Sequence, residues 1–362
     1  MIEIDFERLR TMGLTPAMAN RAAAVPHSEN ETLHLMRVTE VHRDAIRVHD
    51  GRDDQTARSL PRLTRELSDA ELALAVGDWV LVMRDPHGQV WVQARVPPLT
   101  HITRRDADGR RHPVVSNVDT ALLVMGLDDD FNPRRIERYL VLVQSSDVQP
   151  VVVLTKADVA AKTPGRLDER LAALQGRLPA QIDRIAVDAT APSAALALAP
   201  YLAAGQTLVM LGSSGAGKST LTNTLLGAAT QDTGAVRESD GRGMHTTTAR
   251  SLHRLAGGAC VIDTPGVRTL RPDTDAATLA ASFDDIEALS GRCRFRDCRH
   301  HDEPGCAVRE GTDPDRLRNY QKLLRESRRD TIGTLERQRL AVVWKARGRA
   351  TRAWMKMKRG DA

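Results

Sequence analysis

The chain has 362 residues, of which 41% are hydrophobic and 27% charged, a balance typical of a globular protein with roughly two or three domains. Its formal net charge of +5 is mild for this length, so the placement of the charges matters more than their sum. The acidic N-terminus lacks a signal-peptide pattern and no apolar run is long enough to cross a bilayer. We therefore expect a cytoplasmic protein with no membrane partner.

Residues 1–105 are expected to hold a short helical lead-in and a small β-barrel. Apolar and polar residues alternate in four runs, 35–41, 45–48, 76–82 and 90–96. Short strands separated by turns over about 70 residues are typical of an OB-fold, which often binds nucleic acid. Trp79 and Trp91 can stack on bases, but a core position is favoured for both. Exposed Arg and Lys side chains are the better candidates for RNA contact.

The stretch 100–111 is polar and charged, and we interpret it as a linker, with contact to phosphate as the alternative. Residues 106–275 are then expected to form an α/β domain. An apolar strand at 118–125, a helix at 133–144 and a second apolar strand at 150–154 predict a right-handed parallel βαβ unit.

Thr155-Lys156-Ala157-Asp158 follows the second of these strands and matches [N/T]-K-x-D, the base-specificity motif of GTPases. The Asp158 carboxylate can accept hydrogen bonds from the N1–H and the exocyclic amine of guanine, a pair of donors that adenine lacks. Thr155 and Lys156 are assigned to the same nucleotide site, with the Lys156 stem along the base or ribose.

A weaker candidate for the nucleotide site follows a helix at 164–178 and a strand at 182–187. Asp188-Ala189 stands there in the place of an S-A motif whose backbone supports the guanine carbonyl. Asp replaces Ser in this motif, and a plain turn at the end of a strand explains the two residues equally well.

The strongest motif fits G-x-x-x-x-G-K-[ST], the phosphate-binding P-loop, between an apolar strand at 207–211 and a helix at 221–226. Its residues are Gly212, Ser213, Ser214, Gly215, Ala216, Gly217, Lys218, Ser219 and Thr220. Glycines let the backbone N–H groups turn toward phosphate oxygens, and the start of the helix adds a favourable field for the anion. Lys218 is predicted to reach the β- and γ-phosphates, and the Ser219 hydroxyl to ligate Mg²⁺.

Two further segments are predicted to face the γ-phosphate. The Gly-rich stretch 241–248 can supply a threonine hydroxyl to Mg²⁺, and we assign this role to Thr247. After an apolar strand at 260–262, Asp263-Thr264-Pro265-Gly266 matches D-x-x-G. In that motif Asp263 holds Mg²⁺ through water and the Gly266 N–H bonds the γ-phosphate, although a simple β-turn has the same sequence.

The order of these motifs is unusual, because T-K-x-D precedes the P-loop instead of following the D-x-x-G segment. Joining the usual ends of a GTPase and reopening the chain elsewhere gives this order without changing which strands are neighbours. The chain therefore leaves the domain just after its second switch segment, which leads directly into the C-terminal part.

Residues 276–362 begin with a cysteine cluster. Cys293, Cys298, His300 and Cys306 can close a tetrahedral Cys₃His site for one structural Zn²⁺, with His301 as the rival for the fourth position. From about residue 313 to 358 the pattern is helical and increasingly basic, which indicates either a solvated surface or contact with an RNA backbone.

Taken together, these motifs resemble the circularly permuted, ribosome small-subunit-dependent GTPases of bacteria. The resemblance spans nearly the whole chain, from the barrel through the P-loop to the cysteine cluster. It implies an N-terminal OB-fold, a central permuted GTPase domain and a C-terminal zinc-binding helical domain.

The resemblance also implies a function and partners. The implied activity is hydrolysis of Mg²⁺-bound GTP to GDP by a monomer. The implied partners are the small ribosomal subunit and its rRNA. The protein is then expected to act in late maturation of that subunit, and the subunit to stimulate GTP hydrolysis. His245 is then the candidate for positioning the attacking water, because Val267 stands where many GTPases have Gln. A GTP-gated regulator that binds RNA or protein away from the ribosome is the alternative, and an ATPase is a further rival.

Overall fold

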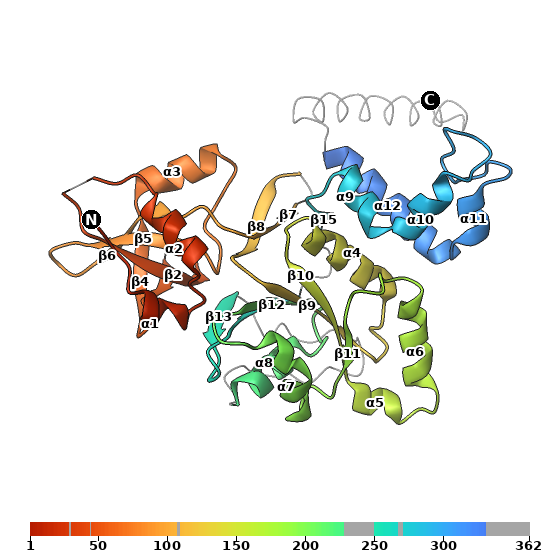
Figure 1. Cartoon of the computed structure of the whole chain (residues 1–362), viewed down its shortest axis with the longest axis horizontal. Helices are drawn as coiled ribbons and strands as arrows, with labels where there is room; N and C mark the ends of the chain where they lie inside the picture. The colour runs from red at the N-terminus through yellow and green to blue at the C-terminus, as the bar shows by residue number, and fades with distance from the viewer. Residues whose placement is uncertain (29, 44, 107–108, 228–249, 267–270, 331–362) are drawn as a thin grey trace, which may run out of the picture.

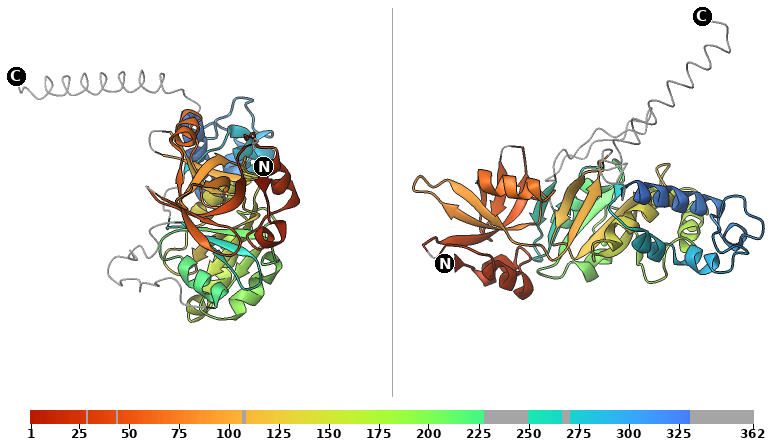
Figure 2. Two further views of the ribbon diagram at one scale, coloured as in Figure 1. Left: turned by 90° about the vertical axis from the view of Figure 1, so that its left-hand side faces the viewer. Right: turned by 90° about the horizontal axis from the view of Figure 1, so that it is seen from above.

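The computed structural model describes residues 1–28, 30–43, 45–106, 109–227, 250–266 and 271–330, which form three parts arranged in a row (Figures 1 and 2). A β-barrel lies at one end, a sheet flanked by helices lies in the middle, and a helical module lies at the other end. Within these ranges no helix has the length and apolar character needed to cross a membrane.

The lead-in consists of β1 (Ile2–Glu3), α1 (Phe6–Arg10) and α2 (Pro16–Ala23). Each helix begins at a side-chain cap: Asp5 accepts from the Arg8 amide at 3.2 Å, and Thr15 accepts from the Met18 amide at 3.3 Å. The strand β1 pairs with the barrel, so the lead-in is an ordered part of it.

The barrel confirms the strands expected from the alternating runs. Its elements are β2 (Leu33–Val41), β3 (Ile46–His49), β4 (Asp54–Ser59), α3 (Pro61–Asp69), β5 (Trp79–Arg84) and β6 (Val90–Arg95). The five strands pair in the order β2-β3-β4-β6-β5, and β5 returns to β2, which closes the barrel. Trp79 is fully buried, which confirms its core position. Trp91 is only half-buried, so its expected core position is wrong, and its indole donates to Asp85 at 3.2 Å.

The interpretation of 100–111 as a linker is wrong. This stretch contributes to a hairpin of β7 (His101–Arg105) and β8 (Arg111–Ser116), to which β15 (Arg271–Pro272) adds a third strand. Asp273, next to β15, binds the Nε atoms of Arg105 at 2.7 Å and Arg111 at 2.8 Å. The expected division between residues 105 and 106 falls inside this hairpin.

The central domain is a mostly parallel sheet in the order β11-β10-β9-β12-β14-β13, with β13 antiparallel. Its strands are β9 (Thr120–Gly126), β10 (Gln149–Thr155), β11 (Arg184–Ala186), β12 (Thr207–Gly212), β13 (Ser251–Arg254) and β14 (Cys260–Asp263). Its helices are α4 (Pro133–Gln144), α5 (Ala157–Ala161), α6 (Arg166–Gln175), α7 (Ser193–Leu198) and α8 (Lys218–Leu226), with a 3₁₀ turn at Ala199–Tyr201.

Both faces of this sheet are covered, which explains the continuous apolar runs of its strands. Alternate residues of β9 enter two different cores: Leu123 packs with α4 and α6, whereas Leu122 packs with α7 and α8. The sheet also continues into the barrel, because Ser251 of β13 pairs with Glu40 of β2. Because β9, β10, β12 and β14 are parallel, their carboxyl ends form one edge of the sheet, where α/β domains bind their ligands.

The C-terminal module contains α9 (Ala276–Ser282), α10 (Asp284–Ser290), α11 (Ala307–Gly311) and α12 (Pro314–Asp330). Its core is built around Phe283, Ile286 and Leu323, and Val141 of α4 belongs to the same cluster. The helical module is thus packed directly on the central domain. Helix α12 is the first part of the helical, increasingly basic stretch predicted from about residue 313 to 358, and the part beyond residue 330 lies outside the described residues.

Candidate nucleotide and metal sites

The P-loop connects β12 to α8 at the ligand-binding edge of the sheet, as the motif requires. A side chain at Gly212 would place its Cβ 2.4 Å from the Val124 carbonyl oxygen, and Gly217 has a left-handed φ of +91°. Both positions therefore need glycine. The turn that results lies at the start of a helix, where free backbone amides and the helix dipole favour an anion.

Lys218 is 6% exposed, and its ammonium donates to two carbonyls of its own loop, those of Gly212 at 3.2 Å and Ser213 at 2.8 Å. Burial lowers the pKa of Lys218 to about 8, although Asp263 and Asp130 oppose the shift. A desolvated cation with neutral acceptors is better stabilised by a phosphate, whose oxygens restore what burial removes.

The expected magnesium ligands Ser219 and Asp263 lie together. The Ser219 hydroxyl donates to Asp263 at 3.2 Å, and Asp263 is fully buried at the end of β14. A hydroxyl beside a buried carboxylate suits the oxygen preference of Mg²⁺, so the residues fit that ion. A Cβ on Gly266 would approach the Ser214 amide nitrogen within 2.3 Å, so the D-x-x-G turn needs glycine to reach the P-loop.

Three further residues were predicted for the nucleotide and magnesium sites. His245 and Thr247 lie outside the described residues. Thr220 is half-buried in the first turn of α8.

The T-K-x-D segment lies next to the P-loop, since β10 and β12 flank the same strand, β9. The Thr155 hydroxyl is buried and donates to the Ala216 carbonyl at 2.6 Å, so it holds the P-loop. Lys156 adopts a left-handed φ of +60° and pairs with Asp128. Asp158 is exposed in the first turn of α5, where its carboxylate can reach a ligand.

The Asp188-Ala189 segment is tied to the P-loop helix, because the Thr224 hydroxyl of α8 donates to the Ala189 carbonyl at 2.6 Å. The Asp188 carboxylate accepts from the hydroxyl of Thr190 at 2.6 Å and from its amide at 2.9 Å. These hydrogen bonds hold the pKa of Asp188 below its ordinary value. The carboxylate is thus engaged within its own turn.

One set of contacts at the P-loop was missed by sequence reasoning. Arg135 of α4 donates to the Ser213 hydroxyl at 2.8 Å and to Asp130 at 2.6 Å, and the same hydroxyl donates to Asp130 at 2.5 Å. We call these three residues the α4 clamp. No sequence motif identifies this clamp, because the sequence gives Arg135 only as a charged residue on an amphipathic helix.

The four predicted zinc ligands come together in the loop before α11. Their ligand atoms all lie within 4.8 Å of one another. Cys293 Sγ is 3.9 Å from Cys306 Sγ and 3.6 Å from His300 Nδ1, close to the roughly 3.5–3.8 Å between ligands of a tetrahedral zinc. The donor set therefore fits a structural Zn²⁺.

The choice between the two histidines follows from the backbone. His300 has a φ of +59° and turns its ring toward Cys306, with Nδ1 3.4 Å from the sulfur. His301 is exposed, and its amide donates to Glu303 at 2.8 Å. His300 is thus the histidine that faces the three cysteines.

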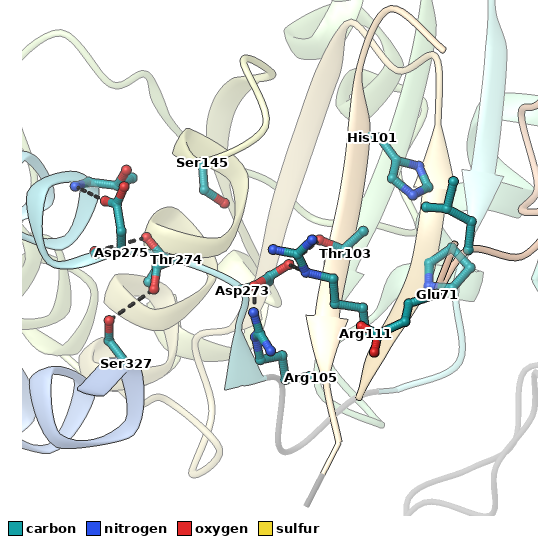
Figure 3. A pocket seen from close by; sticks show the side chains of 13 residues that line it. Glu71, His101, Thr103, Arg105, Arg111, Ser145, Asp273, Thr274, Asp275 and Ser327 are labelled. Carbon is teal, nitrogen blue, oxygen red and sulfur yellow. Dashed lines mark hydrogen bonds and ion pairs between the residues drawn. The ribbon is translucent and has the colours of Figure 1, made fainter. Parts of the chain in front are cut away.

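A separate hollow of about 480 Å³ lies between the β7–β8 hairpin, the end of α4, and the helices α9 and α12 (Figure 3). Arg105 and Arg111 line it, and both are paired with Asp273. They share this one carboxylate, which balances only one of their two charges. The candidate nucleotide site is the P-loop edge, because Lys218, Ser219 and Asp263 meet there.

The fold and the site define a circularly permuted P-loop GTPase. The sequence model of a family described as RsgA GTPase matches residues 96–272. The chain is 47% identical over 298 residues to a small ribosomal subunit biogenesis GTPase RsgA of Xanthomonas axonopodis pv. citri, with 80% of each chain covered. A relative with the same description in Xanthomonas oryzae pv. oryzae is 47% identical over 295 residues, with 79% of each covered. The chain belongs to the RsgA GTPase family.

Solved structures agree on the fold. Thermotoga maritima YjeQ superposes with a TM-score of 0.56 at 24% identity, covering 81% of this chain and 98% of that one. YloQ, described as a circularly permuted GTPase, has a TM-score of 0.54 at 21% identity and covers 84% and 98%. At these identities the likeness concerns the fold, and it confirms the expected barrel and permuted GTPase domain.

Proposed function

We propose that this GTPase of small ribosomal subunit biogenesis binds the subunit and its rRNA and acts late in maturation, and that the subunit stimulates its GTP hydrolysis. Membership of the RsgA GTPase family supports this class of activity. The observation that carries the assignment of the site is the meeting of Lys218, Ser219 and Asp263 at one edge of the sheet.

The nucleotide has a defined place in this proposal. Lys218 and the P-loop amides hold the phosphates, Asp158 selects guanine, and the Gly266 N–H bonds the γ-phosphate. Ser219, Asp263 and Thr247 hold Mg²⁺, which supplies charge to the phosphate oxygens when bound. These residues explain a preference for GTP over ATP that the P-loop alone does not give.

His245 orients the attacking water in this proposal, and contact with the subunit brings it into position. Intrinsic hydrolysis is then slow, because Val267 offers no amide or imidazole to the water. By reciprocity, a subunit that favours the active arrangement binds the GTP-bound protein more tightly than the GDP-bound one.

We further propose three parts, close to residues 1–105, 106–275 and 276–362, with the β7–β8 hairpin spanning the first boundary. The Cys₃His group of the third part holds one structural Zn²⁺. The protein works as a cytoplasmic monomer. The rival reading, a GTP-gated regulator away from the ribosome, predicts the same nucleotide chemistry but no response to small subunits.

Guanine selection is tested by Asp158→Asn. Xanthine carries a carbonyl where guanine has its amine, so the variant should lose affinity for GTP and gain affinity for xanthosine triphosphate. Competition against a fluorescent GDP measures both, and ATP added to the wild type separates the ATPase alternative. An unchanged preference in the variant overturns the assignment of Asp158, and Asp168→Asn on the exposed face of α6 is the matched control.

A further inference from the structure

Helix α4 makes polar contacts with two different parts of the molecule. Arg135 reaches the P-loop, whereas Arg134, Glu137 and Arg138 reach the C-terminal module. Positions 134, 137 and 138 are spaced three and four residues apart and share one face, and position 135 lies to the side of it. One rigid element of 12 residues thus touches both the nucleotide loop and the zinc-binding module.

We propose that α4 couples the C-terminal module to nucleotide binding, with Arg135 as the residue that positions the P-loop. The inference rests on the proposed nucleotide site. Arg135 acts through Ser213 and is a positioning residue, since it contacts the loop and not the reacting atoms.

On the P-loop side, Ser213, which is 1% exposed, is bound through both its side chain and its backbone. Its hydroxyl is bound to Arg135 and Asp130, and its carbonyl accepts from the Lys218 ammonium at 2.8 Å. When a phosphate draws Lys218 away, the carbonyl keeps only the Ala216 amide, at 3.4 Å, and the side chain stays bound to Arg135 and Asp130. The geometry of the phosphate-binding amides that follow Ser213 then depends on the position of α4.

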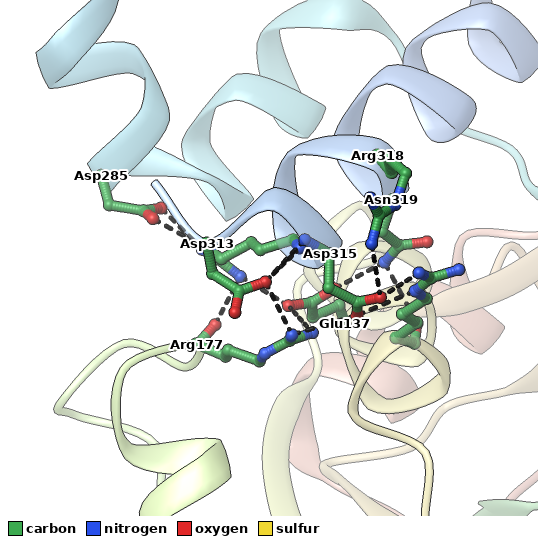
Figure 4. Close-up of polar contacts among 9 residues, drawn as sticks. Glu137, Arg177, Asp285, Asp313, Asp315, Arg318 and Asn319 are labelled. Carbon is green, nitrogen blue, oxygen red and sulfur yellow. Dashed lines mark hydrogen bonds and ion pairs between the residues drawn. The ribbon is translucent and has the colours of Figure 1, made fainter. Parts of the chain in front are cut away.

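On the module side, the contacts are charged (Figure 4), and those of Glu137 are buried. Glu137, 2% exposed, accepts from Arg316 at 2.9 Å and from Asn319 at 2.5 Å. Arg138 pairs with Glu326 at 2.6 Å. A shift of α12 therefore cannot leave α4 unmoved without separating buried charges, which is unfavourable.

The charges of this junction can change partners, which gives it more than one arrangement. Arg316 also pairs with Asp285 at 2.6 Å, and Arg177 reaches both Glu137 and Asp315. Glu137 and Asp315 are thus each within reach of more than one cation. A partner that binds the module and redistributes these ion pairs would move α4, and Arg135 would transmit the movement to Ser213.

The first test measures affinity for GDP in the full-length, zinc-loaded protein. Arg135→Gln should weaken GDP binding about tenfold, as expected when a charge-assisted hydrogen bond no longer holds the loop. Arg135→Lys, which keeps a donor and the charge, should recover most of the affinity. Arg166→Gln is the matched control, because Arg166 pairs with the neighbouring Asp129 and should leave the affinity unchanged.

The second test asks whether the module acts through the same residue. Glu326→Gln on α12 should change GDP affinity about threefold in the wild-type background and have no effect beside Arg135→Gln. Glu310→Gln, exposed on α11, removes the same charge from the module away from α4 and should have no effect in either background.

The outcomes separate the two levels of the account. Wild-type protein that fails to bind GDP would overturn the proposed function. If the wild-type protein binds GDP and Arg135→Gln binds it equally tightly, the coupling through α4 is overturned. An equal effect of Glu326→Gln in both backgrounds overturns it as well. Either result leaves the proposed function standing.

Discussion

The central sheet meets the barrel on one side and the helical module on the other, and the two junctions use different chemistry. At the barrel, a fully buried Arg37 donates to the carbonyls of Met12 and Asn117 and to the Thr207 hydroxyl, and it stacks on Trp79 at 5.2 Å. At the module, buried charges of opposite sign face one another, as in Glu137 and Arg316.

The difference concerns which geometries each junction allows. Carbonyl and hydroxyl acceptors have fixed places in the backbone and in β12, so a permanent cation bound to them has one favourable position. Paired charges can exchange partners, and their attraction is screened when water and salt enter. We infer that the barrel is held in one position and that the module can be adjusted against the central domain.

The largest expected effect is loss of the metal. Cys298→Ser should lower zinc content and destabilise the C-terminal module by several kcal/mol, on the order of half of the roughly 10 kcal/mol or more that structural zinc supplies. Hydrogen exchange should then rise in α9–α12 and not in the barrel. His301→Ala, beside the cluster but exposed, is the control. Full metal content with unchanged exchange would remove Cys298 from the ligand set.

The barrel junction is broken by Arg37→Met, which keeps much of the length and removes every donor. Two buried carbonyls and a hydroxyl lose their partner, so we expect a loss of about 3–5 kcal/mol. Urea unfolding followed by Trp fluorescence measures it, with exposed Arg47→Met of β3 as the control. A loss no larger than that of the control would show that Arg37 does not hold this junction.

The module junction should respond less. Glu137→Gln keeps the shape, and Arg316 retains Asp285, so a loss of about 1–3 kcal/mol is expected. Burial raises the pKa of Glu137, although Arg316 opposes the shift, so part of the favourable charge interaction is already offset. High salt should weaken the exposed pairs around Asp315 and leave Arg37 unaffected. Equal salt sensitivity of both junctions would contradict the comparison.

The smallest expected effect concerns Lys218, a third buried cation, between the two junctions. Its pKa is lowered to about 8 in the free protein, and phosphate should return it toward its ordinary value. Above about pH 8 binding must therefore take up a proton, so GDP affinity should fall by up to about tenfold per pH unit and stay level below. Lys218→Ala should bind weakly without this slope, and the same slope in that variant would assign it elsewhere.

The sequence was sufficient for the features that depend on local order. The P-loop, T-K-x-D and D-x-x-G segments each follow an apolar strand, and parallel strands bring such ends to one edge. Because the predicted zinc ligands lie within 14 residues of chain, 293–306, their meeting was also predictable. The structure then groups His300, and not His301, with the three cysteines.

Contacts between distant parts of the chain were not predictable. The β7–β8 hairpin looked like a linker because its charged residues hide the strand pattern, and the acid that pairs with Arg105 and Arg111 is Asp273, far along the chain. Arg37 sits in an alternating strand, and nothing in the sequence marks it as buried. The α4 clamp likewise joins Arg135 to Ser213, 78 positions later.

The central claim is that the small ribosomal subunit stimulates GTP hydrolysis by this protein. The most direct test measures the rate of GTP turnover as purified subunits are added. The account predicts a slow intrinsic rate that rises by about a hundredfold or more, and a His245→Ala variant that keeps GTP-dependent subunit binding but loses most of the rise. A wild-type rate that is the same with and without subunits would contradict it.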